Sequence, residues 1–341
     1  MQKSNTLRLL LIGIVCLSYH SVLGQLFPQL GAQRAGISAL TYLKMEVSPR
    51  SAGLASANIT LTGDAFSTYT NPATMAEVET FTAGAAHTFW VADIPYTFVS
   101  AIKPTKRAGH FGFSLSGLTS GAMEVRTAFQ PEGTGELFYA TYLTAGLSYA
   151  QRLTDQFSWG VTAKFVQERL AEFTANTGVV DLGFLYATDF KDLRFAVMLQ
   201  SFGPNSVLQG EVELDTSFNA RQVQLDPYPA PTIFKLGISL IPWKSADESQ
   251  TLTTLLQLNH PNDNAENIRF GLEYSYRSLL FVRAGYKLNV RDQDFPTAGF
   301  GLRMRVGRHP LQFDYSLDPM RYLGMVHRVG LSLRLNPVQD R

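Results

Sequence analysis

The sequence predicts an all-β fold, a 14-stranded antiparallel transmembrane β-barrel of the outer-membrane kind, and three observations predict it. Stretches of about ten residues after residue 79 alternate apolar and polar side chains, about fourteen such stretches follow one another, and their connections are alternately long and short. Because a strand projects successive side chains to opposite faces, alternation gives each strand one apolar and one polar face. An even strand number with long loops at one end only is typical of outer-membrane barrels.

The chain begins with what we interpret as a secretory signal peptide at residues 1–24. Lys3 and Arg8 precede a short apolar core, and small residues precede Gln25, where a signal peptidase would cut. The core is shorter than the roughly 20 residues of a membrane-spanning helix. The one cysteine, Cys16, lies inside it, so we expect no disulfide in the mature protein.

Residues 25–79 come next and differ from the rest, because they are rich in Gly, Ala, Ser and Thr and alternate only weakly. Exposed to lipid, such a segment would leave backbone groups without hydrogen bonds. We therefore expect it to lie inside the barrel as an N-terminal hatch, in a lumen that fourteen strands make too wide for side chains alone to fill. The barrel would then comprise residues 80–341.

The strand register is clearest in the C-terminal half. In 268–276, Ile268 and Phe270 share a face opposite Arg269 and Glu273, and a shift by one residue would move such charges into lipid. A soluble β-sandwich also alternates, but it gives no reason for sorting the loops by length.

The polar face, expected to point inward, is rich in glycine and in charge of both signs. Its charged members are Lys164, Asp181, Arg269, Glu273, Arg283, Lys287, Arg303, Arg305, Asp314 and Arg334. They could form a salt-bridge lattice that holds the N-terminal segment, since buried charges must be paired. They could instead line a solute path that favours anions. We favour the lattice.

Composition and motifs argue against catalysis and against nucleic-acid binding. The net charge is +1 and only 17% of the residues are charged, which implies no polybasic surface. The six histidines are scattered without zinc spacing, and 112–117 resembles but misses the nucleophile elbow that a hydrolase would need. Loop 261–267 lacks calcium-loop spacing. We expect no enzyme activity, no cofactor and no metal.

The longer connections are predicted at 119–137, 203–230, 290–296 and 318–325. The first two are very long and are the candidate interaction regions. The second is too apolar for a loop that is only solvated, and its apolar residues include Val207, Leu208, Val212 and Leu214. We expect this loop to be ordered and to contact a partner.

Several short sequence motifs resemble those of the PorV/PorQ family. Its N-terminal signature is matched by 48–53, 63–65 and 71–73, which contain Arg50, Gly53, Asp64, Asn71, Pro72 and Ala73. Motifs in later strands, at 180–183, 283–287, 298–302 and 314–316, also resemble those of the family. The resemblance implies a FadL-like barrel with an internal hatch and a role in type IX protein secretion, which is linked in some bacteria to gliding motility. Its implied partners are the translocon or attachment complex and the C-terminal domains of cargo.

Two functional hypotheses remain. The first is a non-enzymatic barrel in the outer membrane of a Gram-negative bacterium, surrounded by lipid, that engages secretion partners through its outer loops. The alternative is a FadL-like passive channel for hydrophobic solutes. The channel predicts a continuous apolar tunnel, whereas a lumen blocked by charged pairs would argue against it.

Overall fold

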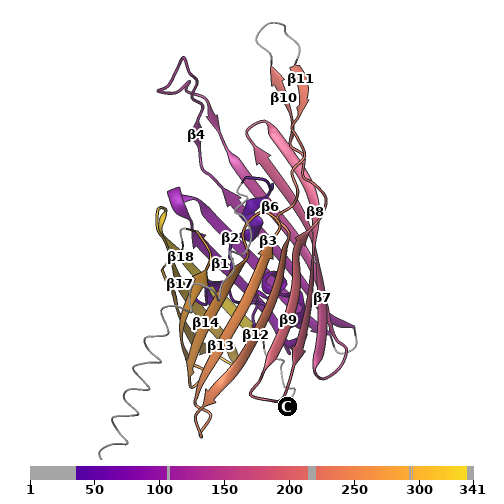
Figure 1. Cartoon of the computed structure of the whole chain (residues 1–341), viewed down its shortest axis with the longest axis vertical. Coiled ribbons are helices and arrows are strands. Elements are labelled where there is room, and N and C mark those ends of the chain that lie inside the picture. The colour runs from indigo at the N-terminus through magenta and orange to yellow at the C-terminus, as the bar shows by residue number, and fades with distance from the viewer. Residues whose placement is uncertain (1–35, 106–107, 214–219, 292, 294, 336–341) are drawn as a thin grey trace, which may run out of the picture.

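The computed structural model describes residues 36–105, 108–213, 220–291, 293 and 295–335, so the predicted signal peptide lies outside the described residues. Fourteen strands form a closed antiparallel barrel, as predicted (Figure 1). They are β1 (Phe81–Phe89), β2 (Pro95–Thr105), β3 (Gly109–Thr119), β6 (Ala140–Arg152), β7 (Phe157–Leu170), β8 (Phe173–Ala187), β9 (Arg194–Phe202), β12 (Ile233–Lys244), β13 (Gln250–Pro261), β14 (Asn267–Tyr276), β15 (Leu280–Leu288), β16 (Thr297–Val306), β17 (His309–Met320) and β18 (Gly324–Leu335).

Each barrel strand pairs with its neighbours along the chain, and the first and last strands close the sheet. The β1–β18 seam runs from Phe81 opposite Leu335 to Phe89 opposite His327. One irregularity lies between β8 and β9, where Gln200 and Ser201 together oppose Asp181 in a β-bulge. Closure leaves no free edge along the wall, as a membrane-spanning sheet requires.

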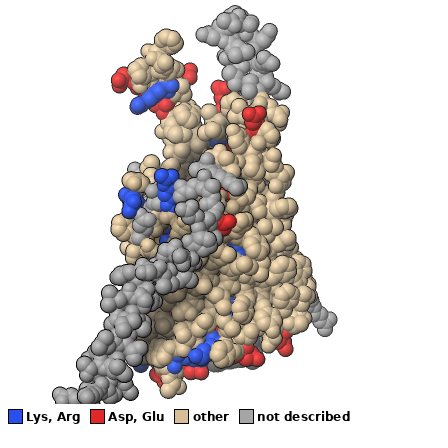
Figure 2. Space-filling model, viewed as in Figure 1, with Lys and Arg blue, Asp and Glu red and all other residues tan. Residues whose placement is uncertain are grey.

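The outward faces of the strands carry the apolar residues that the alternation predicted. Large side chains there are exposed on strand after strand, among them Phe113, Leu147, Phe165, Phe184, Leu236 and Val282. Figure 2 shows a broad face with few charged residues between the projecting hairpins at one end and a charged rim at the other. This band is the surface that faces lipid.

Two hairpins project beyond the same end of the barrel, which we call the outer end (Figure 1). One contains β4 (Met123–Glu124) and β5 (Leu137–Phe138), and the other contains β10 (Gln209–Glu213) and β11 (Ala220–Gln224). Loop length is sorted less strictly than the sequence suggested. The outer turn between β7 and β8 comprises only residues 171–172, and the predicted loop 318–325 is mostly strand, with a turn at residues 321–323.

The helices are short and lie in residues 36–79, which we call the luminal segment, or in an outer turn. They are η1 (Thr41–Lys44), α2 (Pro49–Ala52), α3 (Ser67–Thr70), η2 (Pro72–Glu77) and η3 (Val91–Asp93). The Ser48 side chain caps α2 and the Asn71 side chain caps η2, each followed by a proline at the first helical position. Among the described residues no helix could span a membrane.

Candidate functional site

The luminal segment packs against inward-facing glycines in most of the barrel strands. A Cβ added to Gly160 of β7 would lie 2.5 Å from the Pro72 carbonyl carbon, and one added to Gly237 of β12 would lie 2.6 Å from Ile59. Both distances are shorter than real side chains tolerate. The strand glycines in such contact are Gly84, Gly112, Gly160, Gly183, Gly237, Gly271, Gly285, Gly299 and Gly330. The glycine-rich polar face is therefore the surface on which the luminal segment lies.

Through these contacts the luminal segment passes around the inside of the barrel. Pro49 lies on Gly330 of β18, and Gly53 lies on Gly299 of β16. Farther along, Ala65 lies on Gly84 of β1. The segment ends beside β6, β7 and β8, which η2 contacts before the chain enters β1. Its backbone is thus buried in protein rather than in lipid.

The N-terminal residues whose motifs resemble the PorV/PorQ family lie at the contacts between the luminal segment and the barrel wall. Asn71 Nδ2 donates to the Ile59 carbonyl oxygen at 2.7 Å, and Asn71 Oδ1 accepts from the Ala73 amide at 3.0 Å. Arg50 lies 4.0 Å from the Asp64 carboxylate. Together with Pro72 and Gly53, they form the turns that fit the segment to its glycines.

One side of the lumen, along β14–β18, carries a chain of buried charges. The Glu273 carboxylate accepts from Arg50 at 2.7 Å and from Arg283 at 2.6 Å. Arg283 also reaches Asp314 at 2.6 Å, and Gln312 joins Asp314 to Arg303 with hydrogen bonds of 2.8 Å. The sequence-predicted charges are here brought together with Arg50 of the luminal segment.

A second group of charges lies on the same side. Lys287 contacts Asp318 at 2.9 Å, and Arg328 lies 3.5 Å from the same carboxylate. Arg328 is 2% exposed and donates to the Glu46 carbonyl oxygen at 3.1 Å. The Glu46 carboxylate accepts from Ser51 at 2.7 Å, which fixes the start of α2.

Other predicted charges lie apart from this chain. Lys164 and Asp181 pair on the opposite wall, where Asp181 also accepts from the Ser201 amide of the β-bulge at 2.7 Å. Arg334 donates to the Gly63 carbonyl oxygen, and Arg269 donates to Asn267 at 3.0 Å. Arg305 is exposed near the inner turn and does not join the lattice, because the inward face ends before its guanidinium.

Sequence reasoning missed several members of these groups. Glu46 and Arg328 meet only through the fold, and Asp318 fell in a predicted loop. Glu168 was also missed, although it continues the inward face of its strand two and four residues beyond Val166 and Lys164. Extending the alternation to the ends of the strands would have placed both Asp318 and Glu168 on the inward face.

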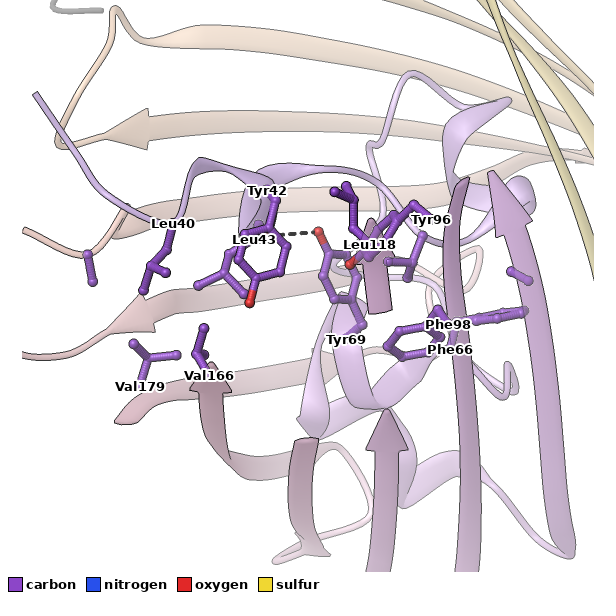
Figure 3. Close-up of a cluster of buried hydrophobic side chains, with 13 residues drawn as sticks. Leu40, Tyr42, Leu43, Phe66, Tyr69, Tyr96, Phe98, Leu118, Val166 and Val179 are labelled. Carbon is purple, nitrogen blue, oxygen red and sulfur yellow. Dashed lines mark hydrogen bonds between the residues drawn. The ribbon is translucent and has the colours of Figure 1, made fainter. Parts of the chain in front are cut away.

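The other side of the lumen, along β2, β3, β6, β7 and β8, carries a cluster of buried apolar and aromatic side chains among serines and threonines, and we call it the apolar half. Here Leu40, Tyr42 and Leu43 pack toward Val166 and Val179, and deeper in the barrel Phe66 and Tyr69 meet Phe98 (Figure 3). Tyr69 donates to the Leu43 carbonyl oxygen at 3.2 Å, which joins the two parts of the luminal segment. Most of the charged groups of the lumen therefore lie along β14–β18, and this apolar cluster lies on the other side.

The outer end carries cavities beside the projecting hairpins. One of about 910 Å³ lies beneath the β4–β5 hairpin, where Leu137, Phe138 and Phe173 form apolar walls. In the predicted partner loop, Val207 and Leu208 are half-buried, and Leu208 lines a smaller cavity of about 180 Å³. The side chain of Val212 and the whole of Leu214 lie outside the described residues.

Comparison with solved structures assigns the fold. The Ralstonia pickettii toluene transporter TbuX superposes with a TM-score of 0.55 at 14% sequence identity, over 85% of this chain and 98% of that chain. The barrel has the FadL-like fold. The CymD monoaromatic hydrocarbon channel matches with a TM-score of 0.52 at 12% identity (84% and 96% coverage). The Pseudomonas putida toluene transporter TodX gives 0.51 at 12% identity (81% and 94% coverage).

No protein-family model and no curated protein matches the sequence. At these low identities the likeness establishes the FadL-like barrel fold and its outer-membrane setting, in contact with lipid. The lipid-facing band of exposed apolar side chains agrees with that location.

Proposed function

We propose that this protein is a passive outer-membrane channel for small apolar molecules. The observation that carries the proposal is the apolar half of the lumen, which runs along the wall from Val166 and Val179 down to Phe98 and is filled by apolar residues of the luminal segment such as Phe66. Among the described residues, most ion pairs of the lumen lie along β14–β18, whereas Lys164–Asp181 lies beside this path. The FadL-like fold, which this chain shares with toluene transporters, agrees with such a role.

In this proposal the luminal segment closes the path at rest and moves to admit solute. Leu40, Tyr42 and Leu43 occupy the apolar half and are held by packing rather than by ion pairs. By contrast, Arg50 and Glu46 tie the segment to the charged side. A shift of residues 40–43, which precede the anchored Lys44 and Glu46, would therefore open the apolar half while the charged side stays in place. The cavity beneath the β4–β5 hairpin would supply the first apolar surface that a solute meets.

The test is uptake of radiolabelled toluene and of a charged molecule of similar size, such as benzoate. Purified protein would be reconstituted into lipid vesicles or produced in cells that lack other hydrocarbon channels. We expect faster toluene uptake than in empty controls and no faster benzoate uptake. Equal toluene uptake with and without the folded barrel would refute the channel.

The projecting hairpins favour a second candidate, an interaction role of the type IX secretion kind implied by the PorV/PorQ resemblance. Phe129, near the tip of the β4–β5 hairpin, is 96% exposed. A large aromatic residue in this position suits contact with a protein partner. An interaction role needs no open lumen, so the two roles can be separated by experiment.

The experiment is affinity purification of the tagged protein from membranes, with and without hairpin residues 126–135. Recovery of secretion components by the full chain, and their loss with the shortened hairpin, would support the interaction role. Failure of both proteins to recover any secretion component would argue against it. Circular dichroism and the resistance of the shortened barrel to unfolding by detergent without heating would serve as the test that it folds.

A further inference from the structure

A small cavity at the outer end is distinct from the closed path through the lumen. Its volume is about 180 Å³, and it lies between the start of the luminal segment, the outer end of β7 and the base of the β10–β11 hairpin. Its wall includes Ala39, Glu168, Ser206, Leu208, Leu225 and Tyr228. Residues from three distant parts of the chain thus enclose one space.

Glu168 is the unusual member of this wall. It faces inward, is 8% exposed and stands directly across from Tyr142 on one side and Ala175 on the other. Tyr142 is its hydrogen-bond partner, whereas Ala175 presents only a methyl group. In the described part of the chain no lysine or arginine pairs with Glu168, and Lys164 on the same strand is paired with Asp181.

A buried carboxylate without a cation is costly, because the protein interior replaces water poorly as a partner for charge. The other carboxylate of the cavity, Asp226, is exposed and adds to the negative charge. The described wall of the cavity therefore holds two acidic residues and no lysine or arginine, and the buried Glu168 marks where an added cation would lie.

The remaining walls suit an apolar body attached to the charge. Leu208 and Leu225 contribute aliphatic surface, and Tyr228 contributes an aromatic ring of the kind that attracts cations. The backbone of Tyr228 is held by two hydrogen bonds with Ser206, at 2.7 and 3.0 Å, so this wall is ordered. The volume equals that of about six water molecules at ~30 Å³ each, or one small ring with a short side chain.

We propose that this cavity binds a small organic cation, a primary amine with an apolar or aromatic body, whose ammonium group pairs with Glu168. The proposal goes beyond passage of apolar solutes, because binding at the outer end requires no movement of the luminal segment. Either function can therefore fail in experiment while the other stands.

The experiment is calorimetric titration of the full folded barrel in detergent with benzylamine, benzyl alcohol and benzoate, which share a ring and differ in charge. We expect benzylamine to bind at least tenfold more tightly than benzyl alcohol and benzoate not to bind. Glu168→Gln should weaken benzylamine about tenfold and leave benzyl alcohol unchanged. Equal binding of the amine and the alcohol, or no effect of Glu168→Gln, would overturn the proposal.

Three further variants test whether the cavity itself holds the amine. Glu172→Gln removes an acid from the neighbouring turn, outside the cavity, and should change nothing. Ala39→Leu fills the cavity without touching the carboxylate and should also abolish benzylamine binding, so the test stands even if Glu168→Gln fails to fold. Arg34→Gln tests whether the chain supplies its own cation. Benzylamine binding to that variant alone would contradict the proposal.

Discussion

Arg50 of the luminal segment donates two hydrogen bonds to the Glu273 carboxylate of β14, from Nε at 2.9 Å and from Nη2 at 2.7 Å. Paired donors of this kind fix both the distance and the orientation of the guanidinium. Glu273 also accepts from Arg283, so one carboxylate joins the segment to the wall and the wall to itself.

Replacing Arg50 should therefore loosen the segment. We expect Arg50→Gln to lower the free energy of unfolding by about 1.5–3 kcal/mol, the usual contribution of hydrogen bonds to charged groups. Arg50→Lys should recover only part of the loss, because an ammonium cannot match both carboxylate oxygens. Urea unfolding of each variant in lipid vesicles measures this change in the free energy of unfolding. Arg126→Gln, on the exposed β4–β5 hairpin, is the control and should stay within about 0.5 kcal/mol of the unmodified protein.

The inward glycines give a second prediction. Gly160→Ala should destabilise the barrel by about 1–3 kcal/mol, since the new methyl group would overlap the backbone at Pro72. Gly117→Ala is the matched control, because a Cβ at Gly117 of β3 meets nothing within 4 Å. Equal stability of Gly160→Ala and Gly117→Ala would mean that the luminal segment does not pack against Gly160.

The ion pair between Lys164 and Asp181 gives a third prediction. Asp181→Asn should lower the free energy of unfolding by about 3–5 kcal/mol, because it leaves Lys164 buried without an anion. Adding Lys164→Met should restore much of the loss, since the double variant buries no unpaired charge. If the double variant were as unstable as the single one, the hydrogen bond from the Ser201 amide would be the main contribution of Asp181.

The apolar half of the lumen gives a fourth prediction, which tests the channel directly. Val166→Asp places a charge among Leu40, Tyr42 and Val179, and we expect toluene uptake to fall about tenfold, because an apolar molecule would have to displace bound water. Ser239→Asp, at a buried inward position of β12 outside the apolar half, is the control and should leave uptake within about twofold. Uptake is normalised to the amount of folded barrel. Equal uptake by both variants would place the path elsewhere.

Much of this architecture was predictable, because strand alternation is a local signal. The register of 268–276 places Arg269 and Glu273 inward in the structure, as predicted from the residues alone. The partners of these charges were not predictable in the same way. Arg50 lies 223 positions from Glu273, and no periodicity relates a short helix to the strand that it meets.

The ends of the strands were the weakest part of the prediction. Arg305 alternates correctly and pairs with Pro310 in the wall, but it lies one residue from the end of β16 and its side chain is exposed. Conversely, Asp318 belongs to β17 because the strand continues into what looked like a loop with proline. The length of a strand depends on how far it pairs with its neighbours, and this pairing cannot be predicted from the sequence of one strand alone.

The closing seam between β1 and β18 has a consequence for biogenesis. The luminal segment precedes β1 in the chain, yet it touches strands as late as β18, which is the last to be made. Once Phe81 pairs with Leu335 the wall is complete, and a segment that fills so much of the interior could not be threaded in afterwards. The luminal segment must therefore fold against the growing sheet before the last strand encloses it.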